Sequence, residues 1–117
     1  MTTYKDAGVD VQATDALVKD ISSLSKSTAR TGSVDSIGSF GGIFDLKQCG
    51  YKDPLLVSGT DGIGTKILLG IETNKLDGLG FDLVGMCLND ILCHGADPLF
   101  FLDYYASSKV DKTSFLQ

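Results

Sequence analysis

Positions 58–66 read Ser58-Gly59-Thr60-Asp61-Gly62-Ile63-Gly64-Thr65-Lys66, and this segment directly follows the apolar run Pro54-Leu55-Leu56-Val57. Glycine lets the backbone approach an anion closely, free N–H groups bind phosphate oxygens, and lysine supplies a positive charge. A carboxylate in the same loop would repel a bare phosphate, but it suits a phosphate that arrives with a divalent cation. The loop therefore indicates a metal–nucleotide site, with a plain glycine-rich turn as the alternative.

Two widespread phosphate-binding motifs do not fit this loop. A P-loop needs a lysine directly after its second glycine, whereas here Thr65 separates Gly64 from Lys66. The dinucleotide-binding fingerprint fails as well, because Ile67 occupies the position of its last glycine. The spacing alone leaves phosphate binding and a simple turn equally open.

The composition is that of an ordinary globular protein with one modest domain. Of the 117 residues, 43% are hydrophobic and 21% are charged. The formal net charge is −5 and the basic residues are scattered, which argues against nucleic acid or an anionic membrane as a partner. No apolar run reaches the roughly 18 residues that span a bilayer. The odd number of cysteines, without a Cys-x-x-Cys pair, predicts reduced thiols and a cytosolic location.

The first part of the chain predicts a helix, a loop and a strand. Apolar residues recur at helical spacing over 10–25, with Asp10 or Thr14 available as N-cap. Residues 25–42 are rich in serine, threonine and glycine, which predicts a mobile loop. A short strand is expected over 43–46.

The rest of the chain predicts two further strands and one clear helix. The strands are expected over 55–58 and 99–105, and the helix over 82–94. Residues 65–73 fit either a helix or a continued strand. The order strand, strand, helix, strand indicates an α/β fold, in the broad sense that includes α+β.

The helix expected over 82–94 carries the second candidate site. Asp82 is its expected N-cap and Gly95 its expected stop. Asp90 falls on the edge of the apolar face, where a carboxylate is costly unless it is paired or binds a metal. It could therefore be a metal or nucleotide ligand, or simply an exposed or hydrogen-bonded edge residue. Asn89 could be a second oxygen ligand or a surface amide.

Several long motifs stand out along the chain. They are Thr3-Tyr4-Lys5-Asp6-Ala7-Gly8-Val9-Asp10, Phe40-Gly41-Gly42-Ile43-Phe44-Asp45-Leu46, the loop 58–66, Asp82-Leu83-Val84-Gly85-Met86-Cys87-Leu88-Asn89-Asp90 and Gly95-Ala96-Asp97-Pro98-Leu99-Phe100-Phe101-Leu102-Asp103-Tyr104-Tyr105. In this order they resemble the N-terminal region of the aminoimidazole ribonucleotide synthetases, the phosphoribosylformylglycinamidine cyclo-ligases of purine biosynthesis. The spacing from Asp90 to Gly95-Ala96 and Pro98 resembles the signature of a superfamily that also holds thiamine monophosphate kinase and selenophosphate synthetase.

The resemblance implies a reaction and a set of ligands. ATP would phosphorylate the formamide oxygen of formylglycinamidine ribonucleotide, and ring closure would give aminoimidazole ribonucleotide. Asp61 and Asp90 would bind Mg²⁺, with Asp45 as a weaker third ligand. Gly41 and Gly42 would belong to a flap over the triphosphate. The other expected ATP or phosphate ligands are Gly59, Thr60, Asp61, Gly62, Gly64, Thr65, Lys66 and Asn89; no catalytic residue is assigned.

The resemblance also implies a domain organisation. Residues 1–117 would be an incomplete N-terminal ATP-binding and dimerisation domain, with a helix and a mobile flap over 1–42 and a core over 43–117. A C-terminal domain would be absent, and the fold would form a homodimer. On this interpretation the chain alone neither turns over substrate nor folds robustly as a monomer. Two alternatives stay open: another ATP-using member of the superfamily, or a non-catalytic truncated product that only dimerises.

Overall fold

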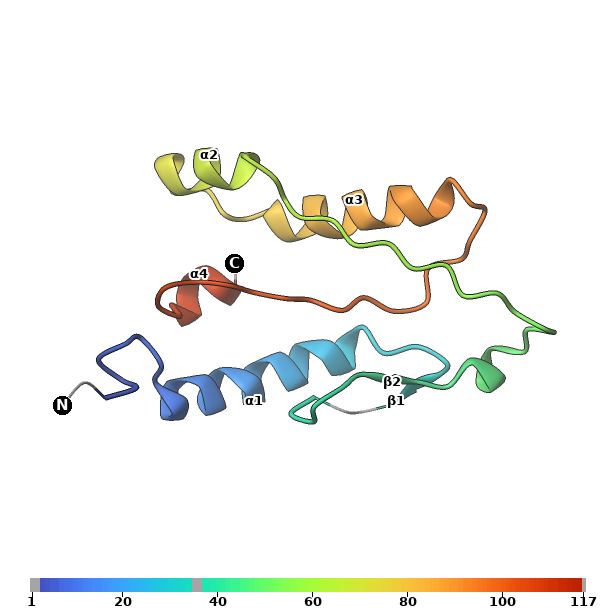
Figure 1. The fold of residues 1–117 in the computed structure, drawn as a ribbon, viewed down its shortest axis with the longest axis horizontal. Coiled ribbons are helices and arrows are strands. Elements are labelled where there is room, and N and C mark those ends of the chain that lie inside the picture. The colour runs from blue at the N-terminus through green and yellow to red at the C-terminus, as the bar shows by residue number, and fades with distance from the viewer. Residues whose placement is uncertain (1–2, 35–36, 117) are drawn as a thin grey trace. The chain divides into compact units, whose positions relative to one another are not determined.

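The computed structural model describes residues 3–34 and 37–116 (Figure 1). The helices are α1 (Val11–Ser27), α2 (Lys66–Thr73), α3 (Leu79–Leu92) and α4 (Lys112–Leu116). Strands β1 (Ser33–Val34) and β2 (Ile43–Phe44) form a two-stranded sheet, and a 3₁₀ helix, η1, covers Leu46–Cys49. The mixture of helices and strands agrees with the class expected from the sequence.

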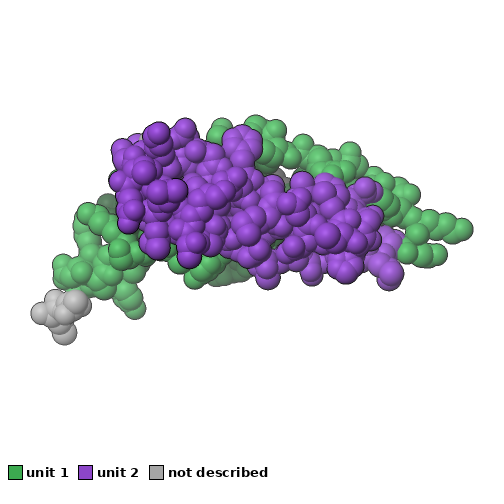
Figure 2. Space-filling view, turned by 90° about the horizontal axis from the view of Figure 1, so that it is seen from above, with its two compact units in different colours: residues 1–53, 102–112 green, residues 54–101, 113–117 purple. Residues whose placement is uncertain are grey.

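The chain forms two compact units, and each is built from two stretches of sequence (Figure 2). Unit 1 comprises Met1–Asp53 and Leu102–Lys112, and unit 2 comprises Pro54–Phe101 and Thr113–Gln117. The predicted flap therefore belongs to unit 1. The loop 58–66 and the helix that carries Asp90 both belong to unit 2.

Helix α1 begins as the sequence predicts. Asp10 is its N-cap, because the Asp10 carboxylate accepts a hydrogen bond from the Ala13 N–H at 3.1 Å. Lys5 Nζ lies 3.1 Å from the other carboxylate oxygen. The Ala13 hydrogen bond, followed by the contact with Lys5, lowers the pKa of Asp10. Leu17 of α1, at 6% exposure, is the only buried apolar side chain among the residues described.

A β-hairpin combines part of the predicted loop with the strand that the sequence predicts over 43–46. The two strands pair antiparallel, and the Asp45 N–H extends the ladder by donating to the Gly32 carbonyl at 2.7 Å. The expected strand is present as β2 over Ile43–Phe44, whereas the two residues of β1 are too few to give an alternating pattern and were not predicted. Residues 37–42 belong to the connection between the strands, while residues 35 and 36 of the expected loop lie outside the described part. The register pairs Ser33 with Phe44 and Val34 with Ile43.

Contacts within unit 1 join its two stretches of sequence. A Cβ placed on Gly8 would overlap the Ser108 carbonyl oxygen, and Gly8 has a φ of +91° that favours glycine. A Cβ on Gly42 would lie 3.1 Å from the Leu102 side chain. Lys112 Nζ lies 2.5 Å from Asp20 Oδ2 of α1. Residues 102–112 therefore contact the N-terminal turn, α1 and the hairpin connection.

Two of the expected strands do not form. Residues 55–58 and 99–105 have no regular secondary structure and run as coil in Figure 1. A strand needs a hydrogen-bonded partner, and the sheet found in the described residues contains only β1 and β2. The expected order of strand, strand, helix, strand is therefore wrong at these positions. Their apolar side chains stay open to water, as Leu55 at 94% and Tyr104 at 89% exposure show.

Residues 65–73 take the helical alternative and form α2. The helix ends at Asn74, which has a φ of +51°. The Asn74 N–H donates to the Ile71 carbonyl at 3.2 Å and the Lys75 N–H donates to the Gly70 carbonyl at 2.9 Å. This pair of bonds is a Schellman motif, in which asparagine takes the position that glycine usually fills.

Helix α3 begins earlier than expected, at Leu79, and its last residue, Leu92, lies shortly before the expected end at His94. Gly78 is its N-cap, so the prediction of Asp82 as N-cap is wrong, and Asp82 instead lies in the first turn. A carboxylate in that turn still complements the helix dipole, which explains why the pattern was misread. The Gly95 stop is confirmed by its φ of +69° and by its N–H, which donates to the Leu92 carbonyl at 2.9 Å.

Candidate functional site

The segment 58–66, called the phosphate loop below, packs on α3 within unit 2. A Cβ placed on Gly59 would lie 3.6 Å from Asp90 Cβ and 3.5 Å from Ile91 Cγ2, which are ordinary contact distances. The Cys87 thiol donates a weak hydrogen bond to the Asp61 carbonyl at 3.6 Å. The fold thus places Asp61 and Asp90, which are far apart in the sequence, on neighbouring elements.

The donor chemistry of these two carboxylates suits Mg²⁺. Asp61 and Asp90 are both exposed, and Asp61 Oδ1 accepts a hydrogen bond from the Gly62 N–H at 2.7 Å. Mg²⁺ is often held by one or two carboxylates, several waters and the phosphates of a substrate. Across residues 3–34 and 37–116, no group of three or more histidine, cysteine, aspartate or glutamate side chains gathers to hold a metal. A Mg²⁺ ion here would therefore rely on water and phosphate for its remaining ligands.

Lys66, the last residue of the phosphate loop and the first of α2, forms an ion pair. Its Nζ lies 2.7 Å from Asp82 Oδ2 in the first turn of α3. The two side chains are 54% and 43% exposed. Water therefore screens the pair, and such exposed pairs contribute only about 0–1 kcal/mol to stability. The ion pair matters here because it sets the position of the Lys66 side chain, and not because of its contribution to stability.

Asp45, the weaker candidate for a metal ligand, is the N-cap of η1 in unit 1. Its carboxylate accepts hydrogen bonds from the Lys47 N–H at 3.0 Å and from Gln48 Nε2 at 2.9 Å. These bonds, that from Gln48 first, lower the pKa of Asp45. Because Asp61 and Asp90 belong to unit 2, a metal site shared with Asp45 stays a prediction.

The predicted flap residues lie in the connection between β1 and β2. The Gly41 carbonyl accepts a hydrogen bond from Ser39 Oγ at 2.8 Å, and Phe40 beside it is fully exposed. The Leu102 side chain limits the space for any side chain at Gly42. The connection thus has a defined local conformation, and its role over a triphosphate stays a prediction.

The remaining predicted phosphate ligands share one property, which is exposure to solvent. Their roles in binding phosphate stay predictions. They are Gly59, Thr60, Gly62, Gly64, Thr65 and Asn89.

Sequence reasoning missed two residues that contact this site. The sequence pattern indicates Asp82 as a helix cap, whereas the structure shows it as the partner of Lys66. The pattern does not link Cys87 to the loop, although the Cys87 thiol contacts the Asp61 carbonyl. The only sequence signal for Asp82 is that it is an acidic residue in the first turn of the helix that carries Asp90. Nothing in the spacing indicated the second.

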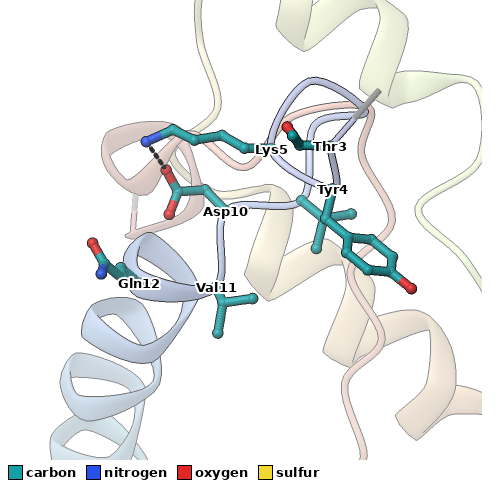
Figure 3. A pocket seen from close by; sticks show the side chains of 7 residues that line it. Thr3, Tyr4, Lys5, Asp10, Val11 and Gln12 are labelled. Atoms are coloured by element: carbon teal, nitrogen blue, oxygen red, sulfur yellow. Dashed lines mark ion pairs between the residues drawn. The ribbon is translucent and has the colours of Figure 1, made fainter. Parts of the chain in front are cut away.

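An open hollow of about 430 Å³ lies elsewhere, at the N-terminal end of α1 in unit 1 (Figure 3). The ion pair between Lys5 and Asp10 belongs to its lining. It contains none of the predicted metal or phosphate ligands. The candidate site is therefore the phosphate loop with α3, and not this hollow.

Comparison with known proteins places the chain in a family. The model of the family described as "AIR synthase related protein, N-terminal domain" matches residues 43–117, which is well over half of the chain. The chain belongs to this family, whose enzymes are in general ATP-dependent. The matched region contains the phosphate loop, α2 and α3. No solved structure matches the chain, and no helix among the described residues is long and apolar enough to cross a membrane.

Proposed function

We propose that this chain serves the ATP-dependent ring closure that converts formylglycinamidine ribonucleotide to aminoimidazole ribonucleotide. ATP transfers its γ-phosphoryl group to the formamide oxygen, which becomes a good leaving group. The neighbouring amidine nitrogen then attacks the activated carbon, the new C–N bond closes the imidazole ring, and phosphate leaves beside ADP. Family membership supports an ATP-using enzyme, and the motifs over 4–10 and 99–104 favour the cyclo-ligase within that family.

The packing of the phosphate loop on α3 supports this proposal most strongly. It brings a glycine-rich loop, a lysine and two exposed carboxylates from distant parts of the sequence into one unit. Glycine-rich loops bind phosphate through backbone N–H groups, and carboxylates bind the cation that accompanies it. A plain turn would not need Asp61 and Asp90 on adjoining elements.

The chain's own residues would contribute positioning and neutralisation of charge. In the proposed site Asp61 and Asp90 hold Mg²⁺, Asn89 offers an amide oxygen, and Lys66 contacts a phosphate oxygen. The ion, when bound, neutralises charge on the phosphoryl group. For Gly41 and Gly42, the role in a flap is proposed from the family resemblance alone. Phosphoryl transfer depends mainly on such placement and electrostatics.

We also propose that the functional form is a cytosolic homodimer. The segment 99–105 exposes its aromatic side chains in the single chain, with Phe100 at 49% and Tyr104 at 89%. Exposed apolar patches of this kind are typical of surfaces that a partner covers. A second copy would bury these side chains.

Calorimetric titration with ATP tests the metal–nucleotide site. We expect binding that requires Mg²⁺ and that weakens about 10-fold or more in Asp61→Asn and in Asp90→Asn, since even residues that support metal ligands contribute about 10- to 100-fold. Asp77→Asn is the matched control, because Asp77 is an exposed aspartate of unit 2 outside the loop and α3. Equal ATP affinity in all four proteins would show that the metal-site proposal is wrong.

A second measurement separates the cyclo-ligase from other ATP-using members of the superfamily. Formylglycinamidine ribonucleotide is expected to raise the melting temperature of the Mg²⁺–ATP complex, whereas thiamine monophosphate is not. The opposite result would favour a kinase-like member. Sedimentation of the chain tests the homodimer, and a monomer at all concentrations would contradict it.

A further inference from the structure

The ion pair between Lys66 and Asp82 is not explained by helix capping. Gly78 is the N-cap of α3, so the Asp82 carboxylate is not needed there. Instead Asp82 Oδ2 accepts a hydrogen bond from Lys66 Nζ at 2.7 Å. The lysine that ends the phosphate loop is thus already in contact with an anion of the chain itself.

The geometry of an ammonium group sets how close a phosphate would come to that anion. Lysine has three N–H donors in a tetrahedral arrangement, and a phosphate oxygen would bind one of them at about 2.8 Å. With Asp82 Oδ2 on another donor, the two oxygens would be about 4.5 Å apart. Repulsion at that separation in water corresponds to about five-fold in affinity for each unit of charge, and to about two-fold when salt screens it.

We propose that Asp82 is a specificity-determining residue that makes the site select metal-complexed phosphate over metal-free phosphate. This inference rests on the proposed nucleotide function of the phosphate loop. A metal-free triphosphate carries two more negative charges than its Mg²⁺ complex, so the Asp82 carboxylate repels it more strongly.

The test compares ATP and pyrophosphate, each in Mg²⁺ and in EDTA, by calorimetry on the whole chain. In Asp82→Asn we expect affinity for the metal-free forms to rise about 2- to 5-fold, and affinity for the Mg²⁺ forms to rise less. Asp82→Glu keeps the charge and is expected to keep the selection. Asp77→Asn is again the matched control. In the Lys66→Met background the effect of Asp82→Asn is expected to shrink to that of the control.

The outcomes separate this inference from the proposed function. If wild type binds Mg²⁺–ATP but Asp82→Asn weakens binding of the metal-free ligands or leaves it unchanged, the inference is wrong. Asp82 would then only position Lys66 or have no role in ligand selection. If pyrophosphate follows the expected pattern while ATP binds to no variant, the selection stands and the nucleotide function fails. If neither probe binds to any variant with an intact circular dichroism spectrum, both are overturned.

Discussion

Gly32 is the residue whose replacement tests the hairpin most sharply. Its φ is +94°, and a Cβ there would lie 2.8 Å from the Asp45 carbonyl oxygen and 2.8 Å from the Phe44 ring. Gly38, in the connection of the same hairpin, has the same φ of +94°, but its Cβ would meet only Val18 at 4.0 Å. The two glycines therefore share the backbone strain of a substitution and differ in the steric clash.

The expected magnitudes follow from these two terms. An L-residue in a left-handed conformation costs about 1–2 kcal/mol, and overpacking costs typically 1–3 kcal/mol more. Gly38→Ala is expected to destabilise the hairpin by about 1–2 kcal/mol. Gly32→Ala is expected to destabilise it by about 2–5 kcal/mol, the sum of both terms.

Amide hydrogen exchange measures this local effect. The Asp45 N–H donates to the Gly32 carbonyl, so its protection reports the opening of the hairpin beside the substitution. In Gly32→Ala we expect protection to fall about 5-fold or more below that in Gly38→Ala, because the two variants differ by the overpacking cost of about 1–3 kcal/mol and about 1.4 kcal/mol corresponds to a factor of ten. Equal protection in the two variants would refute the steric reasoning, since it would mean that Phe44 and Asp45 move aside at little cost.

Two further predictions concern α1 and the thiols. Asp10→Ala is expected to lower helix content, measured by circular dichroism, more than Asp10→Asn, which keeps an acceptor for the Ala13 N–H. The Ala13 hydrogen bond lowers the pKa of Asp10 below its ordinary value of about 3.9. The stabilisation of α1 by this cap is therefore complete above about pH 3.9 and is lost as the pH falls through the lowered pKa. Helix content that stays constant in acid would contradict this. Cys93 is exposed, so iodoacetamide is expected to modify it before the half-buried Cys87, and Mg²⁺–ATP to slow Cys87 further. Peptide mass spectrometry checks the order, and faster modification of Cys87 would count against the packing of the phosphate loop on α3.

The elements that could be predicted are those fixed by local chemistry. Asp10 caps α1 through a neighbour three residues away, and Gly95 ends α3 through its own backbone conformation. The apolar runs over 55–58 and 99–105 misled because they indicate a tendency to be buried, whereas a strand also needs a partner that the pattern does not contain. Asp82 misled because aspartate is the better cap by preference, although Gly78 takes the position.

The sequence indicates candidate residues for the site, whose roles stay predictions, but it does not indicate their contacts. The resemblance pointed to Asp61, Asp90 and Lys66, and the fold brings Gly59 of the phosphate loop against α3 beside Asp90. The pairing of Lys66 with a carboxylate sixteen positions later depends on how α2 and α3 are arranged. Such through-space relations leave no periodic signal in a single sequence.

The two units alternate along the sequence, and this order has a consequence for synthesis on the ribosome. The contacts of Gly8 with Ser108, of Gly42 with Leu102 and of Asp20 with Lys112 cannot form until the chain has passed through the whole of 54–101. Closing a loop of that length costs about 3 kcal/mol of chain entropy. During translation α1 and the hairpin are synthesised early, but they gain these contacts only after residues 102–112 have been made. Helices α2 and α3 can associate before that point. Termination of translation before residue 112 would therefore leave the N-terminal part of the chain incompletely packed, as well as its C-terminal part.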